Sequence, residues 1–398
     1  MDDTARSIRK NNARKTPLPS RIKNRRGCRA YGLKNLAIII AFLSVGRFII
    51  DNNKEFGFLM SLPLQTLSLS ECIYFIITIA ISLARSFIGF YIETTNQRPV
   101  YIHINIVVME AIIAYLNLKH IKHIYSSGWS MIFDIVCVAK LISFHLVSRE
   151  SKRKACTSHT VPTLGHFSYF LSVPTLCFEF EFPLRTKRDT TKIMWRFAQL
   201  ALGFLLFVFV MDQYAIPSIY RITGFSNITT VVENIINFSI STIILFLVFF
   251  YTVFYCLLEA IAEITLFYDT CFYQEWWNAS SAREFWALWN RPVYVWLKKH
   301  VYSAMISKGV SRSKAAAMVF VVSGLVHEYV ISISIKKFTG WFFITMLIQI
   351  PLIHITESFK RRFPSLANFF FWGTFCVIGQ PSVMLLYYRS LYIKKHRM

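Results

Sequence analysis

The sequence predicts an all-α polytopic membrane protein, and three observations carry this prediction. Of the 398 residues, 55% are hydrophobic, 16% are aromatic and only 16% are charged, a composition that is too apolar for an ordinary soluble domain. The apolar residues form runs of about 20, the length that a helix needs to cross a bilayer. Lys and Arg gather between alternate runs, which is typical of the cytosolic loops of membrane proteins.

Nine apolar runs are candidate membrane spans. Their approximate ranges are 35–50, 72–92, 102–118, 129–147, 193–211, 231–258, 314–335, 339–356 and 367–387. An odd number of spans places the two termini on opposite sides of the membrane. No repeat and no Gly/Ser-rich linker divides the runs, so we expect one membrane domain over residues 35–393 that follows a tail of residues 1–34.

The tail is strongly basic. Residues 1–34 hold eleven Lys or Arg against two Asp, which predicts a disordered tail on the cytosolic side. With the N-terminus cytosolic, three further Lys/Arg-rich segments, 148–192, 268–313 and 357–366, fall on that same side. Anionic membrane lipids therefore explain the net charge of +23, and no nucleic-acid partner is expected.

The segment 272–313 mixes aromatic and basic residues. It begins FYQEWWNASSAREFWALWNRPVYVWLKKH, and from Ala282 to Tyr302 apolar residues recur every three or four positions. This spacing predicts an amphipathic helix in the membrane interface, which Pro292 kinks or restarts. The mixture also suits a ligand that carries phosphates and a flat ring. A surface helix without a chemical role is the alternative.

The run 314–335 contains SGLVHEYVIS, which places His327 and Glu328 among apolar residues. A charge in hydrocarbon costs ~2.5 kcal/mol or more, so an ionisable residue inside a span indicates a functional site. If the helix begins near Lys314, His327 lies about 20 Å deep, close to the bilayer midplane. A neutral imidazole there can take a proton from an attacking hydroxyl. A structural histidine in the core is the alternative.

Several motifs together resemble the membrane-bound O-acyltransferase family, in the branch that includes diacylglycerol and sterol acyltransferases. They are FYQEWWN at 272–278, WNRPVYVW at 289–296, SGLVHEY at 323–329, SYFLSVPTLCFEFEFP at 168–183, AIAEITLFYDTCFY at 260–273, MLIQIPL at 346–352 and VIGQP at 377–381. The last four look like the diacylglycerol branch in particular. The resemblance covers roughly residues 31–393. It implies the fold of this family, with a central reaction chamber that acyl-CoA enters from the cytosol and the lipid alcohol enters from the bilayer.

The resemblance also implies site residues. His327 is expected to be the catalytic base and Asn290 a second polar member of the site, whose amide donates to an oxyanion or positions a substrate. Asn290 as a simple helix cap is the alternative. Glu328 lies about 100° round the helix from His327 and is expected to support the site. No Ser or Cys beside His327 resembles an activated nucleophile, so we expect direct transfer without an acyl-enzyme.

Two sets of binding residues are expected. Acyl-CoA should contact Phe272, Tyr273, Glu275, Trp276, Trp277, Asn278, Arg291, Lys298 and Lys299. The acceptor pocket should include Ser323, Gln349, Gln380 and Tyr294. Two positions depart from the family pattern: Glu275 replaces a usual Asp, and Tyr294 stands where a His is usual. The tyrosine can form hydrogen bonds but is no base near neutral pH.

The expected reaction moves a fatty acyl group from acyl-CoA to 1,2-diacylglycerol and yields triacylglycerol and CoA. Acyl-CoA is a co-substrate, and no metal or other cofactor is implied. The family further implies a homo-oligomer, a dimer or a tetramer, in the endoplasmic reticulum membrane. Sterol O-acyltransfer is the nearest alternative, a protein-acylating relative is another, and a non-catalytic lipid transporter or scramblase is the alternative from a different class. For Glu259, Glu263, Arg85, Glu110 and Lys140 we expect structural pairing.

Overall fold

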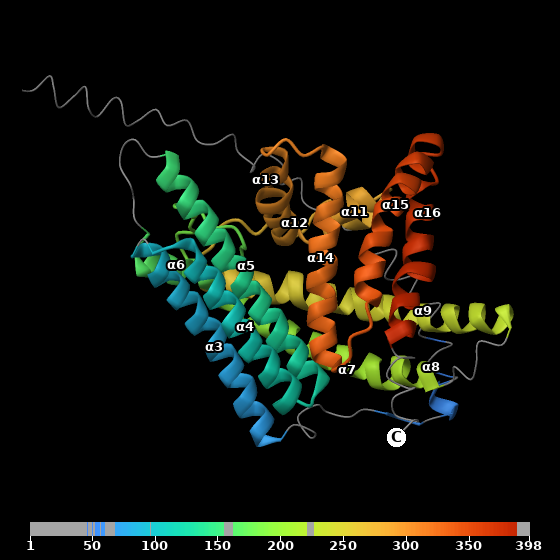
Figure 1. Ribbon diagram of the computed structural model, residues 1–398. Coiled ribbons are helices and arrows are strands. Elements are labelled where there is room, and N and C mark those ends of the chain that lie inside the picture. The colour runs from blue at the N-terminus through green and yellow to red at the C-terminus, as the bar shows by residue number, and fades with distance from the viewer. Residues whose placement is uncertain are drawn as a thin grey trace, which may run out of the picture.

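The structure is a computed structural model that describes residues 68–95, 97–154, 162–220 and 227–387, with a few residues between 46 and 59. Most of these residues are helical, and their one isolated β-bridge joins Leu184 to Phe267. Eight helices of the described part are long and apolar enough to cross a membrane (Figure 1). The all-α polytopic prediction is therefore confirmed. The tail 1–34 and almost all of the predicted span 35–50 lie outside the described residues.

The eight candidate spans agree with the other eight predicted runs to within seven residues at every end. They are α3 (Leu69–Thr94), α4 (Pro99–His120), α5 (Ile124–Lys154), α7 and its continuation through α8 (Thr190–Ser218), α9 and its continuation through α10 (Ile228–Ile264), α14 (Arg312–Ile335), α15 (Trp341–Arg362) and the helix that begins with α16 (Ala367–Tyr387). Local chemistry sets where helices begin. Ser68 and Glu71 form a reciprocal capping box at α3, and the Asp189 side chain accepts a hydrogen bond from the Lys192 N–H at α7.

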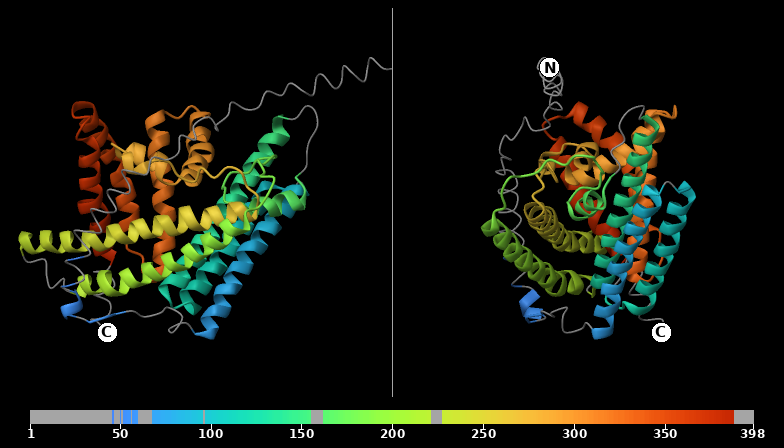
Figure 2. Two further views of the ribbon diagram at one scale, coloured as in Figure 1. Left: turned by 180° about the vertical axis from the view of Figure 1, so that it is seen from behind. Right: turned by 90° about the vertical axis from the view of Figure 1, so that its left-hand side faces the viewer.

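Helices α3, α4 and α5 lie side by side as a bundle (Figure 2). Small and hydroxylated side chains line the contact between α3 and α5. Thr78 Oγ1 lies 2.8 Å from Ser130 Oγ, and Gly89 leaves the room that the Leu141 side chain fills. Such residues let helices approach closely in a membrane, where the hydrophobic effect does not drive helices together.

Two helices exceed the length that a bilayer requires. Thr190–Ser218 has 29 residues and Ile228–Ile264 has 37; at ~1.5 Å per residue the longer one measures about 55 Å, against a hydrocarbon core of ~30 Å. These helices must therefore tilt steeply, and both views show them at a large angle to α14 (Figures 1 and 2). Each includes a π-helical stretch, Met211–Ala215 and Tyr251–Leu257 respectively.

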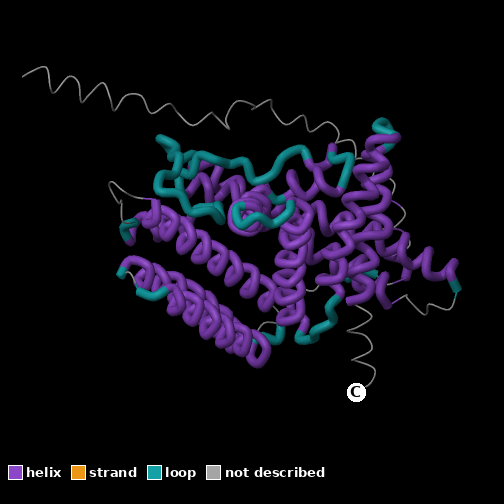
Figure 3. The backbone as a smooth tube through the Cα atoms, turned by 45° about the horizontal axis from the view of Figure 1, so that its top comes forward, coloured by secondary structure: helices purple, strands orange, loops and turns teal. Residues whose placement is uncertain are grey.

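Short helices and loops gather at one end of the molecule (Figure 3). They include α6 (Leu164–Ser172), α11 (Ala282–Trp289), α12 (Arg291–Leu297), a π-helical continuation over Lys298–Tyr302 and α13 (Ser303–Ile306). The predicted restart at Pro292 is confirmed, because a new helix begins after Asn290 with the proline in its first turn. Proline is tolerated there since its missing N–H would have no partner within the helix.

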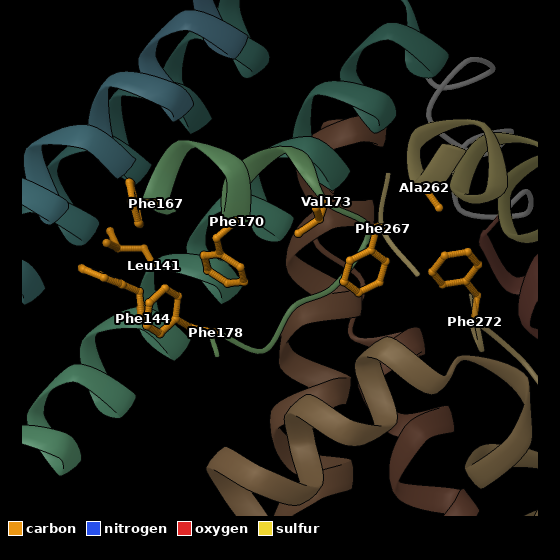
Figure 4. Packing of buried hydrophobic residues seen from close by; sticks show 9 residues of the cluster. All are labelled: Leu141, Phe144, Phe167, Phe170, Val173, Phe178, Ala262, Phe267 and Phe272. Atoms are coloured by element: carbon orange, nitrogen blue, oxygen red, sulfur yellow. The ribbon is translucent and has the colours of Figure 1, made fainter. Parts of the chain in front are cut away.

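An aromatic cluster attaches α6 to the transmembrane bundle (Figure 4). Its buried members are Leu141, Phe144, Phe167, Phe170, Val173, Phe178, Ala262, Phe267 and Phe272. Beside it, buried Lys140 of α5 donates through Nζ to the carbonyl oxygens of Phe170, Leu171 and Val173 at 2.9, 2.8 and 2.6 Å. A cation is favourable at these carbonyls because they end helix α6. Lys140 has the structural role that the sequence predicts.

Glu259 and Glu263 form the expected structural network at the start of α7. Glu263 pairs with Arg185, Lys192 Nζ lies 3.0 Å from Glu259 Oε2, and Arg196 stacks on the Tyr255 ring at 3.9 Å. These contacts join α7 to α10 (Leu258–Ile264). The prediction that the two glutamates are structural is confirmed.

Candidate active site

Helix α14 carries His327 in its interior. His327 Nδ1 lies 2.7 Å from the carbonyl oxygen of Ser323, one turn earlier. Because a carbonyl oxygen only accepts, Nδ1 bears the hydrogen, and Nε2 of the neutral ring keeps its lone pair. The His327 side chain is exposed although the residue lies in the middle of a span. A substrate can therefore reach the imidazole, as a catalytic base requires.

Two neighbours hold the His327 ring. Ser323 Oγ lies 3.4 Å from Nδ1, on the face of α14 that the sequence predicts for it. The ring of Phe342 from α15 lies nearly parallel to the imidazole, with 6.1 Å between the ring centroids. The orientation of the base is thus set by its own helix and by the next one.

Glu328 is directed at α15. It is only 3% exposed, and Gly340 is the N-cap residue of α15. The carboxylate accepts hydrogen bonds from the backbone N–H groups of Thr339, Gly340 and Phe342 at 3.2, 2.8 and 3.0 Å and from the hydroxyls of Ser332 and Tyr387 at 2.8 and 2.7 Å. The first N–H groups of a helix have no partner within it, and an anion at that end is stabilised by the helix dipole. These contacts fix Glu328 to the first turn of α15, and its support of the site stays a prediction.

Asn290 separates α11 from α12 and caps the second helix. Its Oδ1 accepts from the Val293 N–H at 3.2 Å, so the cap that the sequence offers as an alternative is present. The side-chain oxygen of Asn290 is used in this cap, whereas Nδ2 has no hydrogen bond among the described residues. The donor end of the amide is therefore the part available to a substrate.

The buried aromatic residues of the FYQEWWN motif belong to the core. Phe272, Trp276 and Trp277 are all buried, and Trp276 is fully enclosed at the centre of an aromatic cluster. The Trp277 carbonyl accepts from Asn368 Nδ2 at 3.2 Å and from Trp372 Nε1 at 3.0 Å. The motif is thereby fixed to α16 (Ala367–Gly373). These three rings support the segment through their packing, and their direct contact with acyl-CoA stays a prediction.

The remaining residues of the motif lie nearer the surface. Asn278 Nδ2 donates to Glu275 Oε2 at 3.0 Å across the short turn 276–278. The longer side chain that replaces the usual Asp thus closes this turn. Tyr273 is half-buried and packs edge-on against Phe250, with 4.8 Å between ring centroids.

Tyr294 lies between two cations. The Arg291 guanidinium and Lys298 Nζ lie 5.6 and 5.9 Å from the centre of its ring. Lys299 is exposed beside them. Tyr294 thus contacts two of the three cations that are expected to meet acyl-CoA phosphates, and its place in the acceptor pocket stays a prediction.

A further junction attaches this cationic segment to α5, and its members Ser143 and His300 are not among the predicted site residues. Trp296 Nε1 donates to the Ala139 carbonyl at 2.9 Å. Ser143 Oγ accepts from the Phe178 N–H at 2.9 Å and lies 2.8 Å from His300 Nε2. Burial and the neighbouring Lys299 charge lower the pKa of His300 to about 4, so its neutral Nε2 accepts the Ser143 hydrogen at pH 7. For His300 the only sequence signal was its position directly after two lysines.

The two glutamines have different surroundings. Gln349 Oε1 accepts from Trp286 Nε1 at 3.2 Å, which joins α15 to α11. Gln380 follows a π-helical stretch, Thr374–Gly379. Its Oε1 is buried and has no hydrogen-bond partner among the described residues. A buried acceptor without a partner costs about 1–3 kcal/mol, which a substrate hydroxyl would relieve.

The fold and this site define an integral membrane protein with a potential base inside a span, next to an aromatic and basic segment. The chain belongs to the membrane-bound O-acyltransferase family, whose model matches residues 69–390. It is 27% identical over 397 residues to diacylglycerol O-acyltransferase 1C of Glycine max, covering 92% of this chain and 76% of the relative. It is 28% identical to diacylglycerol O-acyltransferase 1 of Arabidopsis thaliana (92% and 74%) and 29% identical to that of Bos taurus (91% and 81%). The family expected from the motifs is confirmed.

Proposed function

We propose that this chain transfers a fatty acyl group from acyl-CoA to the hydroxyl of 1,2-diacylglycerol and forms triacylglycerol and CoA. The observation that carries the proposal is His327, whose Nδ1–H bond to Ser323 leaves Nε2 as a lone-pair base inside a span. The relatives named diacylglycerol O-acyltransferase 1 support diacylglycerol as the acceptor.

In the proposed mechanism, Nε2 takes the hydroxyl proton as the alcohol oxygen attacks the thioester carbonyl carbon. The tetrahedral intermediate collapses, the C–S bond breaks, and the imidazolium returns the proton to the CoA thiolate. The Ser323 carbonyl stabilises the imidazolium because it accepts from Nδ1–H in both protonation states. Such general base catalysis contributes ~10²–10⁴-fold to the rate.

We further propose how the substrates and the protein are placed. Arg291, Lys298 and Lys299 bind the phosphates of acyl-CoA from the cytosol, and Gln380 binds the acceptor on the other side of His327. The same orientation makes the N-terminus cytosolic, which the Lys/Arg-rich tail supports. The proposed location is the endoplasmic reticulum membrane, and the proposed assembly is a dimer or tetramer of this chain.

The choice of acceptor is the test of this proposal. Purified protein in nanodiscs is given oleoyl-CoA with diacylglycerol, a sterol, a long-chain alcohol or no acceptor, and CoA release and lipid product are followed. We expect triacylglycerol from diacylglycerol and only background from the other acceptors. Sterol ester as the main product would make the chain a sterol O-acyltransferase. No ester from any acceptor would favour a lipid transporter or scramblase.

Asn290→Asp separates the two roles of Asn290. Aspartate caps a helix as well as asparagine does, but it lacks the amide hydrogens that would donate to the oxyanion. We expect an unchanged melting temperature and a kcat that falls by ~10²-fold or more, as for other lost oxyanion donors. Asn290→Ala removes cap and donor together and should lower both quantities. Wild-type kcat in Asn290→Asp would leave Asn290 as a cap alone.

A further inference from the structure

Two of the cations assigned to acyl-CoA, Lys298 and Lys299, lie on the π-helical stretch Lys298–Tyr302. The Ser303 N–H donates to the Lys298 carbonyl, five residues earlier, so the turn holds one residue more than an α-helical turn does. Such turns are rare and occur mostly as single turns inside α-helices, frequently at functional sites. Because the α-helix is the far commoner conformation, contacts from outside the stretch must favour this one.

Helix α5 supplies such a contact through Ser143, which is fully buried. Its Oγ lies 2.8 Å from His300 Nε2 and accepts from the Phe178 N–H at 2.9 Å. Burial and the Lys299 charge lower the pKa of His300 to about 4, so the imidazole is neutral at pH 7 and the serine donates to it. The hydroxyl therefore donates one hydrogen bond and accepts another, and these two bonds set its orientation.

Phe178 gives this junction a rigid base. Its ring is fully buried in the aromatic cluster of Figure 4 and packs edge-on against Phe144 and Phe170, with 5.0 and 5.3 Å between the ring centroids. Lys299 Nζ lies 3.5 Å from the Phe178 carbonyl oxygen. The backbone N–H and C=O of one core residue are thus both directed at the cationic segment, the first through Ser143 and the second at Lys299 itself.

A second contact with α5 lies one turn earlier. Trp296 Nε1 donates to the Ala139 carbonyl at 2.9 Å, and the indole lies beside the His300 imidazole, with 5.4 Å between the ring centroids. The two contacts are four residues apart on both helices, 139 and 143 on one and 296 and 300 on the other, a spacing that places them on matching faces. The two exposed lysines lie between these contacts along the chain.

We propose that Ser143 and His300 position Lys298 and Lys299 for the phosphates of acyl-CoA. The inference rests on the proposed function, which assigns these cations to acyl-CoA. If the stretch relaxed to a regular α-helix, one residue would leave the turn, and the side chains after it would rotate by about 100° relative to those before it. The bond between Ser143 and His300 opposes this change. Because each of the two side chains is bound to the other and acts through the lysines, both are positioning residues.

Ser143→Ala removes one hydroxyl and tests the proposal. We expect the KM for oleoyl-CoA and the Kd for a non-hydrolysable oleoyl-CoA analogue to rise by roughly 10-fold, the loss of about one hydrogen bond to a charged group, with kcat unchanged. His300→Leu should give the same loss, and the double variant should lose no more than either single variant. His300→Gln, whose side-chain oxygen can accept the Ser143 hydrogen, should bind the analogue more tightly than His300→Leu does. The control is Ser148→Ala, a buried serine of α5 whose hydroxyl has no hydrogen-bond partner among the described residues; it should bind as wild type does.

A second ligand separates positioning of the cations from a general loss of structure. The matching analogue of oleoyl-pantetheine keeps the acyl chain but lacks the phosphates, so its Kd should be the same in wild type and in the variants. His300 is only half-buried, so His300→Leu provides the test if Ser143→Ala does not fold. An equal rise in Kd for both analogues would overturn the inference, as would a wild-type Kd for the oleoyl-CoA analogue. If wild type forms no triacylglycerol while the variants still weaken binding of the oleoyl-CoA analogue alone, the proposed function fails and the positioning role stands.

Discussion

His327→Ala is expected to lower the rate of triacylglycerol formation by ~10²–10⁴-fold, the range that a general base supplies. The protein should remain folded, because the imidazole is exposed and its hydrogen bonds are to Ser323 within its own helix. Acyl-CoA binding should persist, since the cations Arg291 and Lys298 lie on a separate helix. The measurements are kcat for triacylglycerol formation, the Kd for a non-hydrolysable acyl-CoA analogue, and the melting temperature.

The control for this variant is His354→Ala, which removes an exposed histidine from α15. It should retain the wild-type rate. Full activity in His327→Ala would show that the transfer does not use this base. Loss of rate together with loss of analogue binding would instead assign His327 to binding of acyl-CoA.

The sequence predicted the transmembrane helices well because apolar runs of about 20 residues have few other uses. Residues 314–335 were predicted as a span, and α14 covers Arg312–Ile335. Helix starts were less certain, although Pro292 marked the beginning of α12 because proline suits the first turn of a helix. The two long helices were predicted as spans, but their length was not, because the predicted runs 193–211 and 231–258 end where polar residues begin, at Asp212 and Glu259.

The site was predicted less completely, because its hydrogen bonds and ring contacts join residues that are far apart in the sequence. The sequence places Glu328 beside His327, but it does not show that the loop after α14 returns the N–H groups of Thr339 and Gly340 to that carboxylate. Composition marks an aromatic segment near Trp276 without showing that this ring is fully buried. Family resemblance placed Tyr294 by position, and only the fold shows the cations on both sides of it.

Glu328→Ala is expected to cause the largest loss of stability of any single change proposed for this site. The substitution removes the acceptor of four backbone N–H groups and two hydroxyls, all bound to one buried carboxylate. Buried donors without partners cost about 1–3 kcal/mol each, and local rearrangement will recover part of this. We expect a net loss of roughly 3 kcal/mol, seen as a melting temperature lower by about 5 °C or more.

Two companion variants show whether this loss arises from the carboxylate. Glu328→Gln keeps one carbonyl acceptor but places an NH₂ group against other donors, so it should lose an intermediate amount of stability. Glu233→Ala removes an exposed carboxylate from α9 and should melt as wild type does. If Glu328→Ala melted at the wild-type temperature, the carboxylate would not be what holds α15 to α14. A stable but inactive Glu328→Ala protein would then show that the carboxylate is needed for the reaction and is not needed to attach α15 to α14.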